Sequence, residues 1–217
     1  NAAERAKLAR VKGVKALHPI ETIQAPTPEQ AAGSAIELSR ALSLSGADIA
    51  QNSLGLTGAG VKVAIIDTGV DIDHPAFGGT GTNGTTPFPS TRVVAGWDLV
   101  GDAYNADPTS PSFNPVPSPD SNPDDCGGHG THVAGIVGAN GGGLKGVAPG
   151  VSFGAYRVFG CNGSTEADIM LEAMERALAD GMQVVNQSIG SGRQWPQYPT
   201  AQAASRLAKK GVVMVAS

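Results

Sequence analysis

Two side chains that could exchange a proton lie in distinctive local sequences. His129 stands in the run Gly127–Val137, where glycines lead into small and apolar residues. This pattern predicts a loop that passes into a buried helix, with His129 at the junction, where glycines let another backbone or a substrate approach closely. A histidine at such a place can accept and donate a proton near neutral pH, so His129 is a candidate general base.

A carboxylate suited to orient this histidine lies further toward the amino terminus. The apolar and β-branched run Val61–Ile66 predicts a buried strand, and Asp67 follows directly at its carboxyl end. Open α/β sheets place their sites at the carboxyl ends of strands. We expect Asp67 to accept a hydrogen bond from one ring nitrogen of His129. The alternative is a structural aspartate that caps the following turn.

A metal site is the competing interpretation of the same histidine. Cys126, His129 and His132 have the spacing C-x-x-H-x-x-H, which could ligate zinc. Three ligands at this spacing need one helical face, whereas Cys126 precedes the expected helix in a glycine-rich loop, and no fourth ligand is evident. We therefore expect His132 to be a buried helix residue that is hydrogen-bonded to the backbone.

The surrounding pattern alternates strands with helices. It predicts strands at 61–67, 93–98, 152–159, 182–188 and 212–217, and helices at 47–54, 166–180, 200–210 and from residue 129. This order indicates an α/β fold, a parallel sheet with helices on both faces. Residues 101–125 are rich in Pro, Asp, Asn and Ser and predict a long surface loop.

Composition excludes some functions. The 217 residues are 41% hydrophobic, which is enough for a core, and the net charge of −4 without a basic block argues against a nucleic-acid partner. No run approaches the roughly 18 apolar residues that span a bilayer. The chain begins with Asn1 and shows no secretory signal. We expect both ends to be cut, so the missing signal does not indicate a cytoplasmic protein.

Two motifs carry a resemblance to a known family. I-I-D-T-G-V-D around Asp67 and G-H-G-T-H-V-A-G around His129 resemble the aspartate and histidine motifs of the subtilisin-like serine proteases, the subtilases, in the same chain order. The resemblance extends from about Ser45 to Ser217. It implies a truncated three-layer α/β/α fold and an endopeptidase with an Asp-His-Ser triad. The nucleophile motif G-T-S-M-A does not occur, so we expect this chain to supply Asp67 and His129 only and to be inactive as given.

The same resemblance implies a domain organisation. Residues 1–25 are similar to the end of an inhibitory pro-region, which would be the protein's own inhibitor, and residues 26–45 resemble a linker ahead of the catalytic part at 46–217. Residues 4–17 have helical spacing and become strand-like over 11–17. The alternative for them is an ordinary amphipathic lead-in helix.

Substrate contacts are also implied by the resemblance. Ser188-Ile189-Gly190 resembles the segment that lines the pocket for the side chain before the scissile bond, and the segment with Gly160 and Gly163 resembles the facing strand. A polypeptide substrate would lie between them as an added strand. The alternative is that both segments are plain turns.

The two cysteines, Cys126 and Cys161, leave a disulfide or two inert thiols open on spacing alone. Some subtilases carry a disulfide between matching segments, which implies this bridge, an oxidising compartment and a secreted protein.

The resemblance implies no required cofactor, although calcium is common in the family. Ala76 stands where several relatives carry Asp, so we expect no strong calcium site. The loop acids could bind calcium weakly: Asp102, Asp107, Asp120, Asp124 and Asp125. A second functional hypothesis is a degenerate subtilase that only holds peptides.

Overall fold

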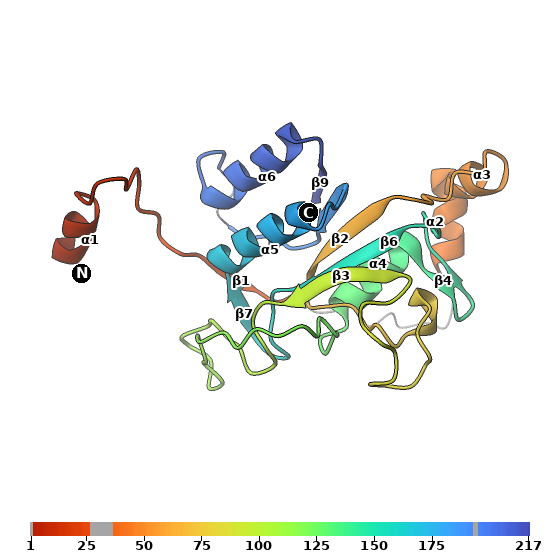
Figure 1. The fold of residues 1–217 in the computed structure, drawn as a ribbon, viewed down its shortest axis with the longest axis horizontal. Helices are drawn as coiled ribbons and strands as arrows, with labels where there is room; N and C mark the ends of the chain where they lie inside the picture. Colours follow the sequence, from red (N-terminus) through yellow and green to blue (C-terminus); the bar gives the residue numbers. More distant parts are fainter. Residues whose placement is uncertain (1, 27–36, 193–194) are drawn as a thin grey trace.

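The computed structural model describes residues 2–26, 37–192 and 195–217 (Figure 1). Its centre is a five-stranded sheet with the strand order β3-β6-β2-β8-β9, and every neighbouring pair is parallel. The strands are β2 (Lys62–Asp67), β3 (Val93–Asp98), β6 (Ser152–Arg157), β8 (Val184–Gln187) and β9 (Val213–Ala216). The parallel sheet expected from the sequence is confirmed.

Helices cover both faces of this sheet. Alternate residues of β2 point to opposite sides: Val63 and Ile65 join a core cluster with Val133 of α4, whereas Ile66 joins the cluster of α5 and α6. Both faces of a parallel strand are buried in this way, which explains the continuous apolar run. The three layers are therefore confirmed, with the helices α4 (His129–Gly138), α5 (Ala167–Ala179) and α6 (Pro199–Lys209).

The amino-terminal part contains a strand that the sequence did not predict. Helix α1 (Ala2–Leu8) lies apart from the sheet, and an extended stretch leads from it to β1 (Thr22–Gln24) (Figure 1). β1 pairs antiparallel with β7 (Ser164–Glu166). The strand expected over 11–17 is wrong, because these residues form turns and irregular backbone with exposed side chains. The pairing forms at β1 instead, where Ile23 is buried.

The segment expected to be a linker is partly helical. Residues 27–36 lie outside the described residues, but α2 (Glu37–Ser45) and α3 (Ala47–Asn52) follow directly. Leu42 of α2 is buried, which favours a helix over an extended linker. Gly46 separates the two helices with a φ of 75°, a left-handed conformation that glycine adopts without strain.

The loop at 101–125 is only partly a surface loop. It contains no regular helix or strand, as expected, but isolated bridges join Asp98 to Asp120 and Asn105 to Asn114. Tyr104 is buried in the core, and Asn105 is 1% exposed. The Asn105 Oδ1 atom accepts a hydrogen bond from the backbone N–H of Ser164 on β7 at 3.1 Å.

The remaining elements are a short 3-10 helix η1 (Pro75–Phe77) and a hairpin of β4 (Asn140–Gly141) and β5 (Leu144–Lys145). Among the described residues, no helix combines the length and apolar character that a membrane span requires.

Candidate active site

The fold brings Asp67 and His129 into direct contact. Asp67 ends β2 and His129 is the first residue of α4. The His129 Nδ1 atom lies 2.8 Å from Asp67 Oδ1 and 3.0 Å from Oδ2, which is hydrogen-bond distance. Asp67 Oδ1 also accepts a hydrogen bond from the backbone N–H of Thr68 at 2.7 Å. The contact expected between the two side chains is therefore present in the fold.

Burial differs between the two partners. The Asp67 side chain is fully buried, whereas 16% of the His129 side chain is exposed. Burial raises the pKa of Asp67, although the hydrogen bonds from His129 and Thr68 and the charge of His129 oppose this shift. Because Nδ1 is held by the carboxylate, Nε2 is the ring nitrogen left to exchange a proton with a third group.

Gly130 sets the distance between α4 and β2. A Cβ atom at this position would lie 2.1 Å from the Gly69 carbonyl oxygen and 3.0 Å from Asp67 Cβ. The backbone N–H of Gly130 donates a hydrogen bond to Thr68 Oγ1 at 2.9 Å. Only glycine permits this approach, so the first turn of the helix can lie directly against the end of the strand.

The substitution Gly130→Ala is expected to separate α4 from β2 and to lower the free energy of unfolding by about 1–3 kcal/mol, as overpacking does. Denaturant unfolding of the full-length protein measures this change. Gly135→Ala in the same helix is the matched control, because a Cβ at Gly135 meets nothing within 4 Å. We expect that control to be neutral or stabilising, by up to about 1 kcal/mol. Equal stability of the two variants would contradict the role of Gly130.

Asp125 organises the loop that leads into α4. One carboxylate oxygen accepts hydrogen bonds from the backbone N–H groups of Gly127 and Gly128, at 2.7 and 2.8 Å. The other oxygen accepts from the backbone N–H and the hydroxyl of Thr131. Burial opposes the charge, but these hydrogen bonds prevail and the pKa of Asp125 is lowered. From the sequence, Asp125 is expected only as a weak calcium ligand. The N-cap residue of α4 is Gly128, which makes no side-chain cap. Asp125 takes this role from three residues upstream by accepting the N–H of Thr131.

The lowered pKa of Asp125 predicts how the stability of the protein depends on pH. The stabilisation from Asp125 is present above the unfolded-state pKa of about 3.9 and is lost as the pH falls through the folded-state value. In Asp125→Asn we expect a lower free energy of unfolding at pH 7 and a smaller loss of stability on acidification than in the unmodified protein. Urea unfolding between pH 7 and pH 2 measures both. Asp168→Asn, which removes an exposed carboxylate of α5, is the control for net charge. Parallel stability curves for Asp125→Asn and the unmodified protein would contradict the assignment.

Cys126 and Cys161 are joined by a disulfide with a Cα–Cα distance of 5.3 Å. The bridge fixes the loop that carries Asp125 to the chain after β6. Buried Arg157 lies beside it, with an Nη2 atom 3.0 Å from Cys126 Sγ and an Nη1 atom 2.8 Å from an Asp102 oxygen.

The geometry contradicts a zinc site formed by Cys126, His129 and His132. The Cys126 sulfur is bonded to Cys161 and cannot ligate a metal in this state. His132 is exposed, so its expected burial is wrong. The helix turns His132 toward solvent, while its neighbour Val133 faces the sheet. Within the described residues, one group of three potential ligands has its atoms within 4.8 Å, and it consists of Asp102 and the two bridged cysteines.

The position at which several relatives carry an aspartate offers no side-chain oxygen for calcium in this chain. Ala76 is buried in η1 and offers no side-chain oxygen. The loop acids expected to bind weakly are used in other contacts: Asp102 pairs with Arg157, while Asp107, Asp120, Asp124 and Asp125 accept backbone hydrogen bonds. Weak binding remains a prediction.

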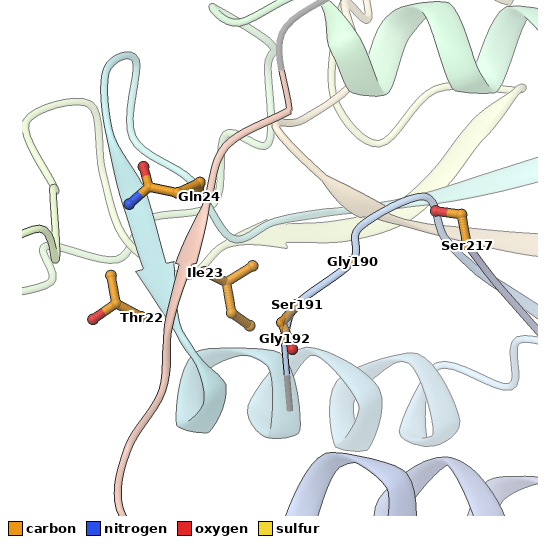
Figure 2. Close-up of a pocket in the computed structure, with 7 residues that line it drawn as sticks. All are labelled: Thr22, Ile23, Gln24, Gly190, Ser191, Gly192 and Ser217. Carbon is orange, nitrogen blue, oxygen red and sulfur yellow. The ribbon is translucent and has the colours of Figure 1, made fainter. Parts of the chain in front are cut away.

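Of the segments expected to bind substrate, the one that ends at Gly190 faces the amino-terminal strand. A cavity of about 540 Å³ lies between β1 and Gly190–Gly192 (Figure 2). In Figure 2 the Ile23 side chain points toward Ser191, and the side chains of Thr22 and Gln24 point the other way.

Among the other residues expected to bind substrate, Gly163 contacts the amino-terminal segment, whereas Ser188, Ile189 and Gly160 contact other parts of the fold. Gly163 accepts a hydrogen bond through its carbonyl oxygen from the backbone N–H of Ala25, at 3.2 Å. The Ser188 hydroxyl donates to Asn186 Oδ1, and Ile189 packs on the core cluster of α5 and α6. Gly160 packs against the loop at 101–125, where a Cβ would lie 2.2 Å from the Tyr104 carbonyl oxygen.

Comparison with known proteins identifies the family. The profile described as "Subtilase family" matches residues 58–217, and the chain therefore belongs to the subtilase family.

The chain is similar to individual subtilases over most of its length. It is 36% identical to the minor extracellular protease Vpr of Bacillus subtilis over 216 residues, which are 97% of this chain and 24% of Vpr. It is 33% identical to subtilisin Savinase of Lederbergia lenta over 170 residues, 77% of this chain and 51% of that protein. It is 34% identical to subtilisin DY of Bacillus licheniformis over 168 residues, 75% of this chain and 48% of that protein. The chain thus spans between a quarter and about half of these relatives.

Proposed function

We propose that the full-length protein is a serine endopeptidase in which Asp67 and His129 are two members of a catalytic triad. The observation that carries the proposal is the contact of 2.8 Å between His129 Nδ1 and the buried Asp67 carboxylate. The third member, a serine, belongs to a part of the longer protein outside this chain. The chain as given supplies only the first two members and is inactive.

In this mechanism His129 acts as general base and then as general acid. Its Nε2 atom takes the proton of the serine hydroxyl as the oxygen attacks the peptide carbonyl, and returns the proton to the leaving amine as the acyl-enzyme forms. Asp67 fixes the tautomer with the proton on Nδ1 and stabilises the imidazolium. Water then hydrolyses the acyl-enzyme by the same exchange of protons.

The substrate in this proposal is an extended polypeptide that adds a strand to β7. The chain's own residues 1–25 form a pro-region that inhibits the enzyme, and β1 holds the place of the substrate. The support is the antiparallel register of β1 on β7, with Ile23 opposite Thr165, and the buried Ile23 side chain beside the cavity at Gly190–Gly192. Backbone pairing supplies affinity and the side-chain pockets supply choice.

We place the protein outside the cell. The similarity to Vpr, which is named an extracellular protease, supports this location. The disulfide between Cys126 and Cys161 is also typical of an oxidising compartment.

The test is labelling of the full-length protein with a serine-directed fluorophosphonate. We expect one labelled serine in the unmodified protein and strongly reduced labelling in His129→Ala, because the hydroxyl loses its base. Equal labelling of both proteins would show that His129 does not activate the serine.

Absence of any labelled serine, together with retained peptide binding, would favour the alternative function. The protein would then be a degenerate subtilase that holds peptides without cleaving them. Binding of a fluorescent peptide with the sequence of residues 18–26 separates this outcome from an unfolded protein.

A further inference from the structure

The chain ahead of β1 is held by two hydroxyl groups from the segment between β8 and α6. The Tyr198 hydroxyl donates a hydrogen bond to the Pro19 carbonyl oxygen at 3.2 Å. The Ser191 hydroxyl donates to Glu21 Oε2 at 3.1 Å. Both contacts lie on the amino-terminal side of the residues that pair with β7.

Further backbone contacts extend the pairing at both ends of β1. The Ala25 N–H donates to the Gly163 carbonyl, and the Glu21 carbonyl accepts from the N–H of Ala167 at the start of α5. Between these two points β1 follows β7 in antiparallel register. Polar contacts thus hold the bound segment from Pro19 to Ala25, well beyond the three residues of the strand itself.

Tyr198, which makes the outermost contact, is held in place by the fold. Tyr198 is only 3% exposed and precedes the first residue of α6. Its ring lies edge-on to Trp195, with 5.8 Å between the ring centroids. A buried ring that ends in a hydroxyl presents one donor at a defined place and loses little freedom when it binds.

We propose that Ser191 and Tyr198 form an outer subsite for polypeptide substrates. Counted from the substrate residue that binds Gly163, as Ala25 does, Ser191 binds the residue four positions earlier, at the place of Glu21. Tyr198 binds the residue six positions earlier, at the place of Pro19. The inference rests on the proposed endopeptidase function. Tyr198 binds a backbone carbonyl, which every residue offers, so it selects for length. Ser191 binds an acceptor side chain, so it selects for a carboxylate or amide at the position of Glu21. The substrate class is therefore long, extended polypeptide with an acidic or amide residue at that position.

The experiment compares three fluorogenic peptides with the processed full-length protein. The long peptide carries the sequence of residues 18–25 ahead of the reporter, the short one begins at the position of Thr22, and the third is the long peptide with Glu21→Ala. Two hydrogen bonds at ordinary net strength predict that kcat/KM is about tenfold higher for the long peptide than for the short one. The third peptide is expected to lie between them.

Two variants assign this preference to the two hydroxyl groups. Tyr198→Phe keeps the ring and is expected to lower kcat/KM severalfold for both long peptides, with no change for the short one. Ser191→Ala is expected to remove the difference between the Glu21 and the alanine peptide. Far-UV circular dichroism and a denaturant unfolding curve like those of the unmodified protein show that each variant is folded.

The possible results separate the outer subsite from the proposed function. Cleavage of the long and short peptides at equal kcat/KM overturns the outer subsite and leaves the endopeptidase intact. If none of the peptides is cleaved, the proposed function fails, and fluorescence polarisation of the labelled peptides decides the inference. Tighter binding of the long peptide, weakened by Tyr198→Phe, supports the subsite. Equal binding, or no binding, overturns it.

Discussion

Replacing His129 with alanine in the full-length protein is expected to lower kcat for peptide hydrolysis by about 10⁶, a magnitude carried over from subtilisin itself, a relative of this chain. The reason is geometric. His129 Nδ1 is held by the Asp67 carboxylate at 2.8 Å, and in the proposed mechanism the imidazole takes the serine proton. Without it the hydroxyl remains protonated and a weak nucleophile. Steady-state cleavage of a fluorogenic peptide, with active-site titration, measures the loss.

The variant Asp67→Asn tests the same unit from its other side. An amide can present its NH₂ group to Nδ1 and favour the wrong tautomer, so we expect kcat to fall by about 10⁴. The double variant should be no worse than His129→Ala alone, because the two residues act as one unit. Additive losses would contradict that unit. Gly135→Ala, on the same helix with open space around its Cβ, is the control that should retain activity.

Removal of the disulfide by the double substitution of Cys126 and Cys161 with serine is expected to lower the free energy of unfolding by about 3–4 kcal/mol. The bridge spans 35 residues, and the chain-entropy model gives this magnitude for the loop that the bridge closes in the unfolded chain. Denaturant unfolding of the oxidised full-length protein and the double variant measures the difference.

The reduced protein provides an independent comparison. Treatment of the unmodified protein with a thiol reductant should bring its stability toward that of the double variant and leave the variant itself unchanged. A double variant as stable as the oxidised protein would show that packing around Arg157 and Asp102, which form an ion pair at 2.8 Å, is sufficient to hold the loop.

The sheet was predictable because its sequence pattern is local. A strand that is buried on both faces is marked by a short apolar run, such as Val63–Ile66, and a helix repeats its apolar residues every three or four positions, as Ile169, Ala173 and Ala177 do. The contact between Asp67 and His129 was predictable from motifs of several residues. Asp67 and His129 are 62 residues apart in the chain. Their contact was expected because Asp67 follows a buried strand and because the two motifs have the chain order of the family.

Features that depend on distant partners were not predictable. The short strand β1 has only three residues and is defined by its pairing with β7, whose sequence Ser164–Glu166 carries no strand pattern. His132 was expected to be buried because its neighbours are apolar, but its exposure depends on the angle at which α4 packs on the sheet. Ser191 and Tyr198 could not be selected, because isolated hydroxyl residues have no sequence signal.

The buried asparagine of the long loop connects that loop to β7, the strand that pairs with β1. Asn105 Oδ1 accepts the N–H of Ser164, and the Ala106 N–H donates to the Ser164 carbonyl at 3.0 Å, while the opposite edge of the same strand carries β1. The long loop therefore supports the edge of β7 opposite to the edge that pairs with β1. Under the proposed function, a change in this loop would move the strand that pairs with the substrate without altering Asp67 or His129.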